Sequence, residues 1–177
     1  MNKWIVAGLG NLGEQYLNTR HNLGIDVVRS LVDSGDSAGW KVDIRCHAEL
    51  ARLSLAEALC VFPLKFMNKS GEPLKCVAEY YKVLPDKVLV VHDDMELPLG
   101  KLELVFGGSA RGHNGVRSIE VALGTGDFWR LRLGIGRPEE SVDVTDFVLS
   151  TFREEEVEPV KKMALEAIEK INNLLAE

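Results

Sequence analysis

The sequence lacks any apolar run near the ~20 residues that a membrane-spanning helix needs. It also lacks a leader-like segment, because an expected strand begins almost at the first residue. Its three cysteines, Cys46, Cys60 and Cys76, form no C-x-x-C pair. That odd number and spacing favour free thiols in a reducing cytoplasm over a disulfide framework or a cysteine metal site.

The chain does have enough apolar residues for one sizeable core. Of its 177 residues 46% are hydrophobic, which predicts a single domain over 1–177. The net charge of −6 argues weakly against a nucleic-acid partner. Five arginines nevertheless gather between residues 107 and 137: Arg111, Arg117, Arg130, Arg132 and Arg137. They fit either a local basic surface or arginines scattered over a solvated face, and charge alone does not separate the two.

Hydrophobic periodicity indicates strands that alternate with helices. The near-continuous apolar run 87–92 is typical of a central strand covered on both faces. Apolar residues at helical spacing from Glu154 onward mark a long C-terminal amphipathic helix. Further strands are expected at 4–9, 48–54, 58–64, 101–106 and 129–135, and further helices at 23–32, 74–81 and 116–123. The order predicts an α/β fold, a twisted mixed sheet flanked by helices on both faces.

The segment Gly8-Leu9-Gly10-Asn11-Leu12-Gly13 matches the dinucleotide-binding pattern G-x-G-x-x-G. That pattern requires a helix to begin at the glycines, so that its N-terminus meets the pyrophosphate. Here about ten mostly polar residues precede the helical pattern, and Asp33 falls on the expected helix instead of at the end of a second strand. The glycines are better explained by a backbone that passes close to another segment.

Polar side chains gather in four segments that follow strands or open helices. The segments are 11–21, 66–71, 92–98 and 107–115. They contain a histidine, a carboxylate and several asparagines, and such segments can converge at one edge of an α/β sheet. A carboxylate that orients an imidazole, an imidazole that activates water, and amides that hold the substrate would together suit hydrolysis without a covalent intermediate.

Other interpretations of these residues remain open. No G-x-S-x-G elbow supports a serine hydrolase. A metal site could use His92, Asp93 and Asp94, although no H-E-x-x-H or Cys/His spacing supports one. Taken singly, His92 fits a hydrogen-bonded histidine near the core, Asp93 a turn or cap residue, and Asn68 and Asn114 helix caps.

Six motifs in order resemble the bacterial-type peptidyl-tRNA hydrolase family over essentially the whole chain. They are Gly8-Leu9-Gly10-Asn11, Thr19-Arg20-His21-Asn22, Met67-Asn68-x-Ser70-Gly71, His92-Asp93-Asp94, Gly112-His113-Asn114-Gly115 and Arg130-Leu131-Arg132-x-Gly134-Ile135-Gly136. The resemblance implies a cytoplasmic, usually monomeric enzyme that needs no metal or other cofactor. It would cleave the ester between peptide and tRNA in peptidyl-tRNA from stalled ribosomes.

The same resemblance implies a role for particular residues. His21 would be the general base, oriented by Asp93, with Asn11 beside them binding the peptide end. The other substrate-binding residues would be Tyr16, Met67, Asn68, His113 and Asn114, with Asn114 also helping to hold the attacking water. Arg132 would contact a tRNA phosphate. The stretch 143–150 and the C-terminal helix would flank the cleft as a mobile cover.

The chain departs from the family pattern mainly where tRNA would be held. Leu12 replaces a usual proline, Lys65 a usual threonine, and Val105 a lysine that some members use on a tRNA phosphate. We therefore expect Arg111 or Lys101 to supply the second phosphate contact. The alternative functions are a catalytically silent RNA-binding module and a dinucleotide-dependent oxidoreductase.

Overall fold

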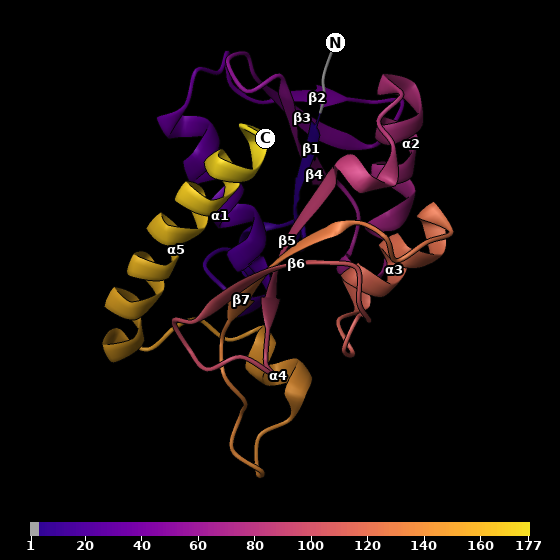
Figure 1. Cartoon of the computed structure of the whole chain (residues 1–177). Helices are drawn as coiled ribbons and strands as arrows, with labels where there is room; N and C mark the ends of the chain where they lie inside the picture. The colour runs from indigo at the N-terminus through magenta and orange to yellow at the C-terminus, as the bar shows by residue number, and fades with distance from the viewer. Residues whose placement is uncertain (1–3) are drawn as a thin grey trace.

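A mixed sheet of seven strands runs through the centre of the protein, whose computed structural model describes residues 4–177 (Figure 1). The strands are β1 (Trp4–Gly8), β2 (Lys41–Asp43), β3 (Ala48–Leu53), β4 (Ala58–Pro63), β5 (Val88–Asp94), β6 (Leu102–Phe106) and β7 (Trp129–Gly134). Their order across the sheet is β2-β3-β4-β1-β5-β7-β6. β1 pairs in parallel with β4 and β5, and β5 with β7, whereas β3 and β6 pair antiparallel with their neighbours.

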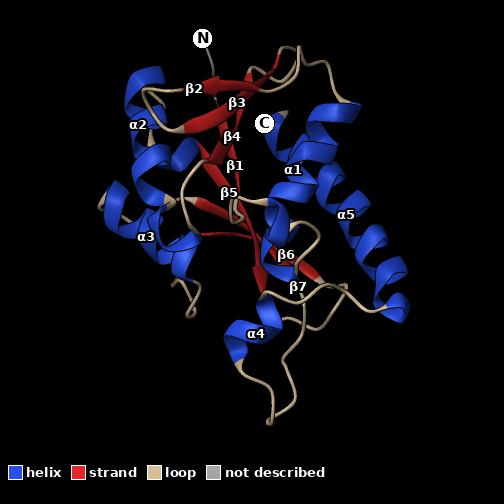
Figure 2. Cartoon of the chain, turned by 180° about the vertical axis from the view of Figure 1, so that it is seen from behind, coloured by secondary structure: helices blue, strands red, loops and turns tan. Residues whose placement is uncertain are grey.

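Helices cover both faces of the sheet, as the sequence predicted. α1 (Leu23–Ser34) and α5 (Glu154–Leu175) lie on one face, and α2 (Gly71–Tyr81) and α3 (Asn114–Leu123) lie on the other (Figure 2). The short α4 (Val144–Val148) lies beyond one end of the strands. Four 3₁₀ turns complete the elements of residues 4–177: η1 (Glu14–Tyr16), η2 (Arg20–Asn22), η3 (Met67–Lys69) and η4 (Pro85–Lys87).

Alternate side chains of β1 enter two separate hydrophobic cores. Trp4 and Val6 belong to the core under α1 and α5, and Ile5 and Ala7 belong to the core under α2 and α3. All four are at most 3% exposed. A strand buried on both faces needs apolar residues at every position, which explains the continuous apolar runs of β1 and β5. Each large side chain buried here stabilises the fold by about 1.5–3 kcal/mol.

Two glycines let α1 cross the end of the sheet at close range. A Cβ at Gly24 would lie 2.2 Å from the carbonyl oxygen of Val91, and one at Gly8 would lie 2.7 Å from the Cα of Ile25. The glycine-rich segment thus serves close backbone approach, as expected. α1 begins only at Leu23 and carries Asp33, so no α-helix starts at the G-x-G-x-x-G pattern.

The elements expected from periodicity are confirmed, but two short elements were missed. β2 has three residues, pairs only with β3, and leaves Val42 61% exposed, so it carries no burial pattern. α4 has five residues, fewer than two helical turns. Its start is fixed by the side chain of Asp143, which accepts hydrogen bonds from the backbone N–H groups of Thr145 and Asp146.

The expectation of three free thiols was wrong. Cys46, in the turn between β2 and β3, forms a disulfide with Cys76 on α2, and their Cα atoms are 5.4 Å apart. The partners are 30 residues apart in the chain, and only the packing of α2 against the β2–β3 hairpin brings them together. Cys60 on β4 is free and buried. Within residues 4–177 no helix combines the length and apolarity needed to cross a membrane.

Candidate active site

The four polar segments converge at one edge of the sheet. Three of them follow the carboxyl ends of β1, β4 and β5, which are parallel neighbours. The fourth follows β6, which runs in the opposite direction, and it reaches the same edge because the segment crosses back before α3 begins. A cleft of about 290 Å³ opens there.

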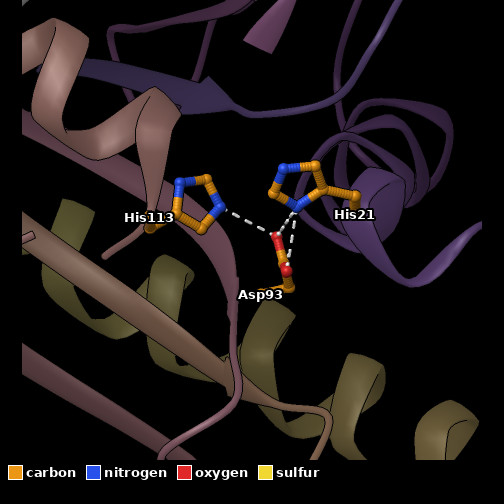
Figure 3. Close-up of side chains that lie close together, drawn as sticks. All are labelled: His21, Asp93 and His113. Carbon is orange, nitrogen blue, oxygen red and sulfur yellow. Dashed lines mark hydrogen bonds and ion pairs between the residues drawn. The ribbon is translucent and has the colours of Figure 1, made fainter. Parts of the chain in front are cut away.

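An imidazole and a carboxylate form the centre of this cleft. His21 on η2 lies with its Nδ1 at 2.9 and 3.0 Å from the two carboxylate oxygens of Asp93, at the end of β5 (Figure 3). Asp93 is 2% exposed. Since a carboxylate only accepts hydrogen bonds, Nδ1 of His21 carries the hydrogen and Nε2, on the far side of the ring, carries the lone pair.

The two partners shift each other's pKa. Burial lowers the pKa of His21, but the charge of Asp93 and the hydrogen bond to it raise the pKa above its ordinary 6.5. Burial raises the pKa of Asp93, but His21 and His113 outweigh that effect and hold it far below its usual range. Asp93 is therefore ionised at neutral pH, and His21 beside it is a stronger base than an ordinary histidine.

His113 supports Asp93 from the other side and is fixed in one tautomer. Its Nδ1 accepts hydrogen bonds from the backbone N–H groups of Gly115 and Val116, at 3.1 and 3.3 Å, as the N-cap of α3. The hydrogen must then be on Nε2, which donates to Asp93 Oδ1 at 2.9 Å (Figure 3). The cap of α3 is thus His113, not Asn114.

His21, Asp93 and His113 could hold a metal by proximity alone, since their ligand atoms lie within 4.8 Å of one another. The hydrogen on His113 Nε2 works against this. A metal bound at Nε2 would move that hydrogen to Nδ1, against two backbone N–H donors. The residues present therefore fit a metal poorly.

The metal set considered from the sequence, His92 with Asp93 and Asp94, does not come together as such. These residues are consecutive on β5, so their side chains alternate between its faces. His92 is buried, its Nδ1 donates to the carbonyl oxygen of Asp93 at 2.7 Å, and its ring packs against His113 at 4.9 Å. Burial, with the neighbouring His113, lowers the pKa of His92 to about 3, so it is a neutral core histidine.

Asn11 joins two of the polar segments through hydrogen bonds. Its side-chain oxygen accepts from the backbone N–H of Met67 at 2.8 Å. Its backbone N–H donates to Asn22 Oδ1 at 2.8 Å, and its carbonyl accepts from Asn22 Nδ2 at 3.0 Å. The side-chain oxygen is therefore occupied, and the amide nitrogen of Asn11 is the group that can donate to a substrate.

The cleft brings together most of the residues expected in the site. Those that line it are Asn11, His21, Met67, Asn68, Asp93, Arg111, His113 and Asn114. Asn68 and Asn114 are exposed to the cleft. Further lining residues, which were not predicted to contact the substrate, are Phe66, Asp94, Met95, Ala110, Gly112, Val144, Thr145, Val148 and Leu149. The last four belong to the expected cover 143–150, but no α5 residue lines the cleft within residues 4–177.

Three expected site residues lie outside the cleft lining: Tyr16, Lys101 and Arg132. Tyr16 is on η1, and Lys101 lies just before β6. The Arg132 side chain is 6% exposed; its Nε donates to Asp94 Oδ2 at 2.7 Å and its Nη1 to Glu103. These two carboxylates neutralise the charge of Arg132, so a phosphate has to compete with them for the guanidinium.

Taken together, the fold and the site define an α/β enzyme with a histidine–aspartate pair in an amide-lined cleft at the carboxyl edge of a mixed sheet. A family model described as peptidyl-tRNA hydrolase matches residues 5–177. The chain belongs to the peptidyl-tRNA hydrolase family.

Individual relatives agree with this assignment. The chain is 41% identical over 167 residues to a peptidyl-tRNA hydrolase of Corynebacterium efficiens, covering 94% of this chain and 93% of that one. It is 45% identical over 164 residues to a peptidyl-tRNA hydrolase of Thermus thermophilus, covering 93% and 84%. The crystal structure of the peptidyl-tRNA hydrolase of Acinetobacter baumannii superposes with a TM-score of 0.92 at 30% identity, covering 99% and 89%.

Proposed function

We propose that this protein hydrolyses the ester that joins the peptide to tRNA in peptidyl-tRNA, with His21 as general base. The observation that carries the proposal is the contact of His21 Nδ1 with both oxygens of a buried, ionised Asp93. This contact leaves Nε2 as a base of raised pKa in a cleft that is open to water.

In the proposed reaction, His21 Nε2 takes a proton from a water molecule while the water oxygen attacks the ester carbonyl carbon. The tetrahedral intermediate then collapses, the bond to the ribose oxygen breaks, and that oxygen receives the proton from His21. Products are the peptide acid and tRNA with a free hydroxyl. A positioned imidazole contributes about 10²–10⁴-fold to such a rate.

Neutral amides around the base suit the recognition of a peptide. Asn68 and Asn114 line the cleft, and Asn11 offers its amide nitrogen. We propose that they hydrogen-bond the peptide end and the developing oxyanion, with Asn114 also holding the water. Free aminoacyl-tRNA lacks the additional amide, and an unmatched buried polar group costs about 1–3 kcal/mol.

Arg111 is our proposed contact for a tRNA phosphate. It lines the cleft, is exposed, and adopts a left-handed backbone conformation with φ 47°, next to Gly112 with φ 81°. Arg132 is the second candidate, conditional on release from Glu103, and Lys101, outside the cleft lining, is the third. We further propose that residues 1–177 act as one domain, as a monomer in the cytoplasm, without metal or cofactor.

One assay tests the function against its rivals. The protein is incubated with N-acetyl-aminoacyl-tRNA and, separately, with free aminoacyl-tRNA, in the presence of EDTA and without nucleotide. Selective release of the acetylated amino acid is expected. Binding without release would favour the silent RNA-binding module, and neither binding nor release would favour the oxidoreductase.

A further inference from the structure

Arg20, the residue before the proposed base, is a buried cation whose three guanidinium nitrogens each donate a hydrogen bond. Its side chain is 3% exposed. Its Nε donates to Ser150 Oγ at 3.1 Å, and its Nη1 and Nη2 donate to the two carboxylate oxygens of Glu156 at 3.2 and 2.7 Å. Arginine is almost never fully buried unless it is paired, so such a site indicates a specific positional role.

Two aromatic rings complete the surroundings of the Arg20 guanidinium. Its Cζ lies 4.5 Å from the ring centroid of Phe147 and 4.8 Å from that of Phe152. Both distances are within the range of an attractive cation–π contact, which strengthens when the cation is shielded from water. Phe147 is on α4 and Phe152 lies between α4 and α5. One side chain therefore contacts α4, the segment between α4 and α5, and the first turn of α5.

The backbone makes the same connection. The N–H of Arg20 donates to the carbonyl oxygen of Ser150 at 2.9 Å, and Thr19 forms an isolated bridge with Thr151. The segment held in this way directly follows α4, whose inner side forms one wall of the cleft. The wall residues are Val144, Thr145, Val148 and Leu149.

His21 does not need the Arg20 side chain to stay in place. Its ring is held by both oxygens of Asp93, and the following residue, Asn22, makes two hydrogen bonds with the backbone of Asn11. The Arg20 side chain instead donates its hydrogen bonds to Ser150, which follows α4, and to Glu156, in the first turn of α5. Loss of the Arg20 side chain is therefore expected to loosen α4 more than it displaces the ring of His21.

We propose that Arg20 is a positioning residue that fixes α4 as a wall of the cleft, and so sets the affinity for the acyl-aminoacyl end of the substrate. The inference rests on the proposed use of this cleft as the active site. It predicts that disturbing Arg20 changes KM far more than kcat.

The test substitutes Arg20→Lys and measures hydrolysis of N-acetyl-aminoacyl-tRNA. Lysine keeps the charge but cannot make the bidentate contact with Glu156 or lie flat between the two rings. We expect KM to rise about three- to tenfold, the scale of a lost shielded cation–π contact, with kcat within about twofold of the wild type. Phe147→Leu, which keeps apolar bulk and removes the ring face, should show the same split.

Arg29→Lys is the matched control. Arg29 on α1 also lies against two rings, those of Trp40 and Phe62 at 5.1 and 5.3 Å, and pairs with Glu49 at 2.7 Å. None of these residues lines the cleft. We expect Arg29→Lys to lower the melting temperature and leave both KM and kcat unchanged.

Hydrogen–deuterium exchange gives a readout that does not depend on turnover. Amides of 144–150 should exchange faster in Arg20→Lys and Phe147→Leu than in the wild type, and not in Arg29→Lys. A fall in kcat at constant KM, unchanged kinetics, or unchanged exchange in 144–150 would each overturn the role of Arg20. A wild type that fails to turn over the substrate would instead count against the proposed function, while the exchange experiment would still decide about Arg20.

Discussion

At the scale of single residues, the reaction depends on one imidazole nitrogen. His21→Ala removes the only base we assign, while the fold keeps Asp93 bonded to His113. We expect kcat to fall by about 10²–10⁴-fold with tRNA binding retained. Single-turnover hydrolysis and a tRNA-binding titration measure the two effects separately. A folded variant with near-normal turnover would eliminate His21 as the base.

The pH dependence of the reaction follows from the pKa of the same histidine. A general base is inactive when protonated, so kcat/KM should fall on the acid side through a pKa above 6.5. Asp93→Asn removes the charge that raises this pKa and leaves burial, which lowers it. We therefore expect a slower enzyme, in which kcat/KM falls on the acid side at a lower pH than in the wild type. Profiles of kcat/KM between about pH 5 and 9 test this. If the fall on the acid side occurs at the same pH in Asp93→Asn as in the wild type, the charge of Asp93 is not what raises the pKa of His21.

At the scale of secondary-structure elements, the β6–β7 ladder decides whether Arg132 can meet a phosphate. Glu103 lies directly opposite Arg132 in this ladder and pairs with it. Glu103→Gln keeps the shape, frees part of the guanidinium and removes a negative charge. We expect KM for the tRNA substrate to fall about two- to fivefold, the scale of a half-exposed ion pair.

Glu120→Gln is the matched control for Glu103→Gln. Glu120, on α3, pairs at 2.7 Å with Arg130, which lies on β7 like Arg132. Glu120 does not line the cleft. Glu120→Gln should leave KM unchanged. Equal effects of the two substitutions would mean that total charge matters, and not the release of Arg132.

The disulfide is a second feature at the scale of elements, because it joins the β2–β3 turn to α2. Neither cysteine lines the cleft. Cys76→Ser should lower the free energy of unfolding by about 3–4 kcal/mol, the entropy of closing a loop of this length, with kcat unchanged. Urea unfolding with and without reductant measures this loss. In reductant, the free energies of unfolding of Cys76→Ser and the wild type should be equal. Three reactive thiols in the unfolded, unreduced wild type would show that the pair does not form.

At the scale of the whole molecule, the sequence predicts what depends on burial pattern or on strand ends that meet at one edge of the sheet, and it misses the distant pairs that neither of these brings together. β5 could be predicted because both its faces are covered, whereas Val42 of β2 is exposed and carries no pattern. His21 and Asp93 are 72 residues apart. Their contact was expected because segments at strand ends meet at one edge of an α/β sheet, and because the six motifs resemble a known family.

The sequence could not reveal which charges neutralise each other. Arg132 pairs with Glu103, which faces it from a neighbouring strand, and such a register is not visible in hydrophobic periodicity. The same holds for Cys46 and Cys76, which meet only through the packing of α2. The buried Arg20 was likewise hidden, since its partner Glu156 is 136 residues away.

The net charge of −6 repels the proposed substrate, because a tRNA is a polyanion. Overall repulsion must be offset by local cations, and Arg111 is the exposed arginine among the residues that line the cleft. Arg111→Ala should weaken tRNA binding and reduce the slope of log affinity against log salt by about 0.7–0.9, the loss of one phosphate contact. Lys101→Ala, outside the cleft lining, should change the slope less. If Arg111→Ala leaves both affinity and slope unchanged, the phosphate contact lies elsewhere, and Arg132 released from Glu103 becomes the first candidate.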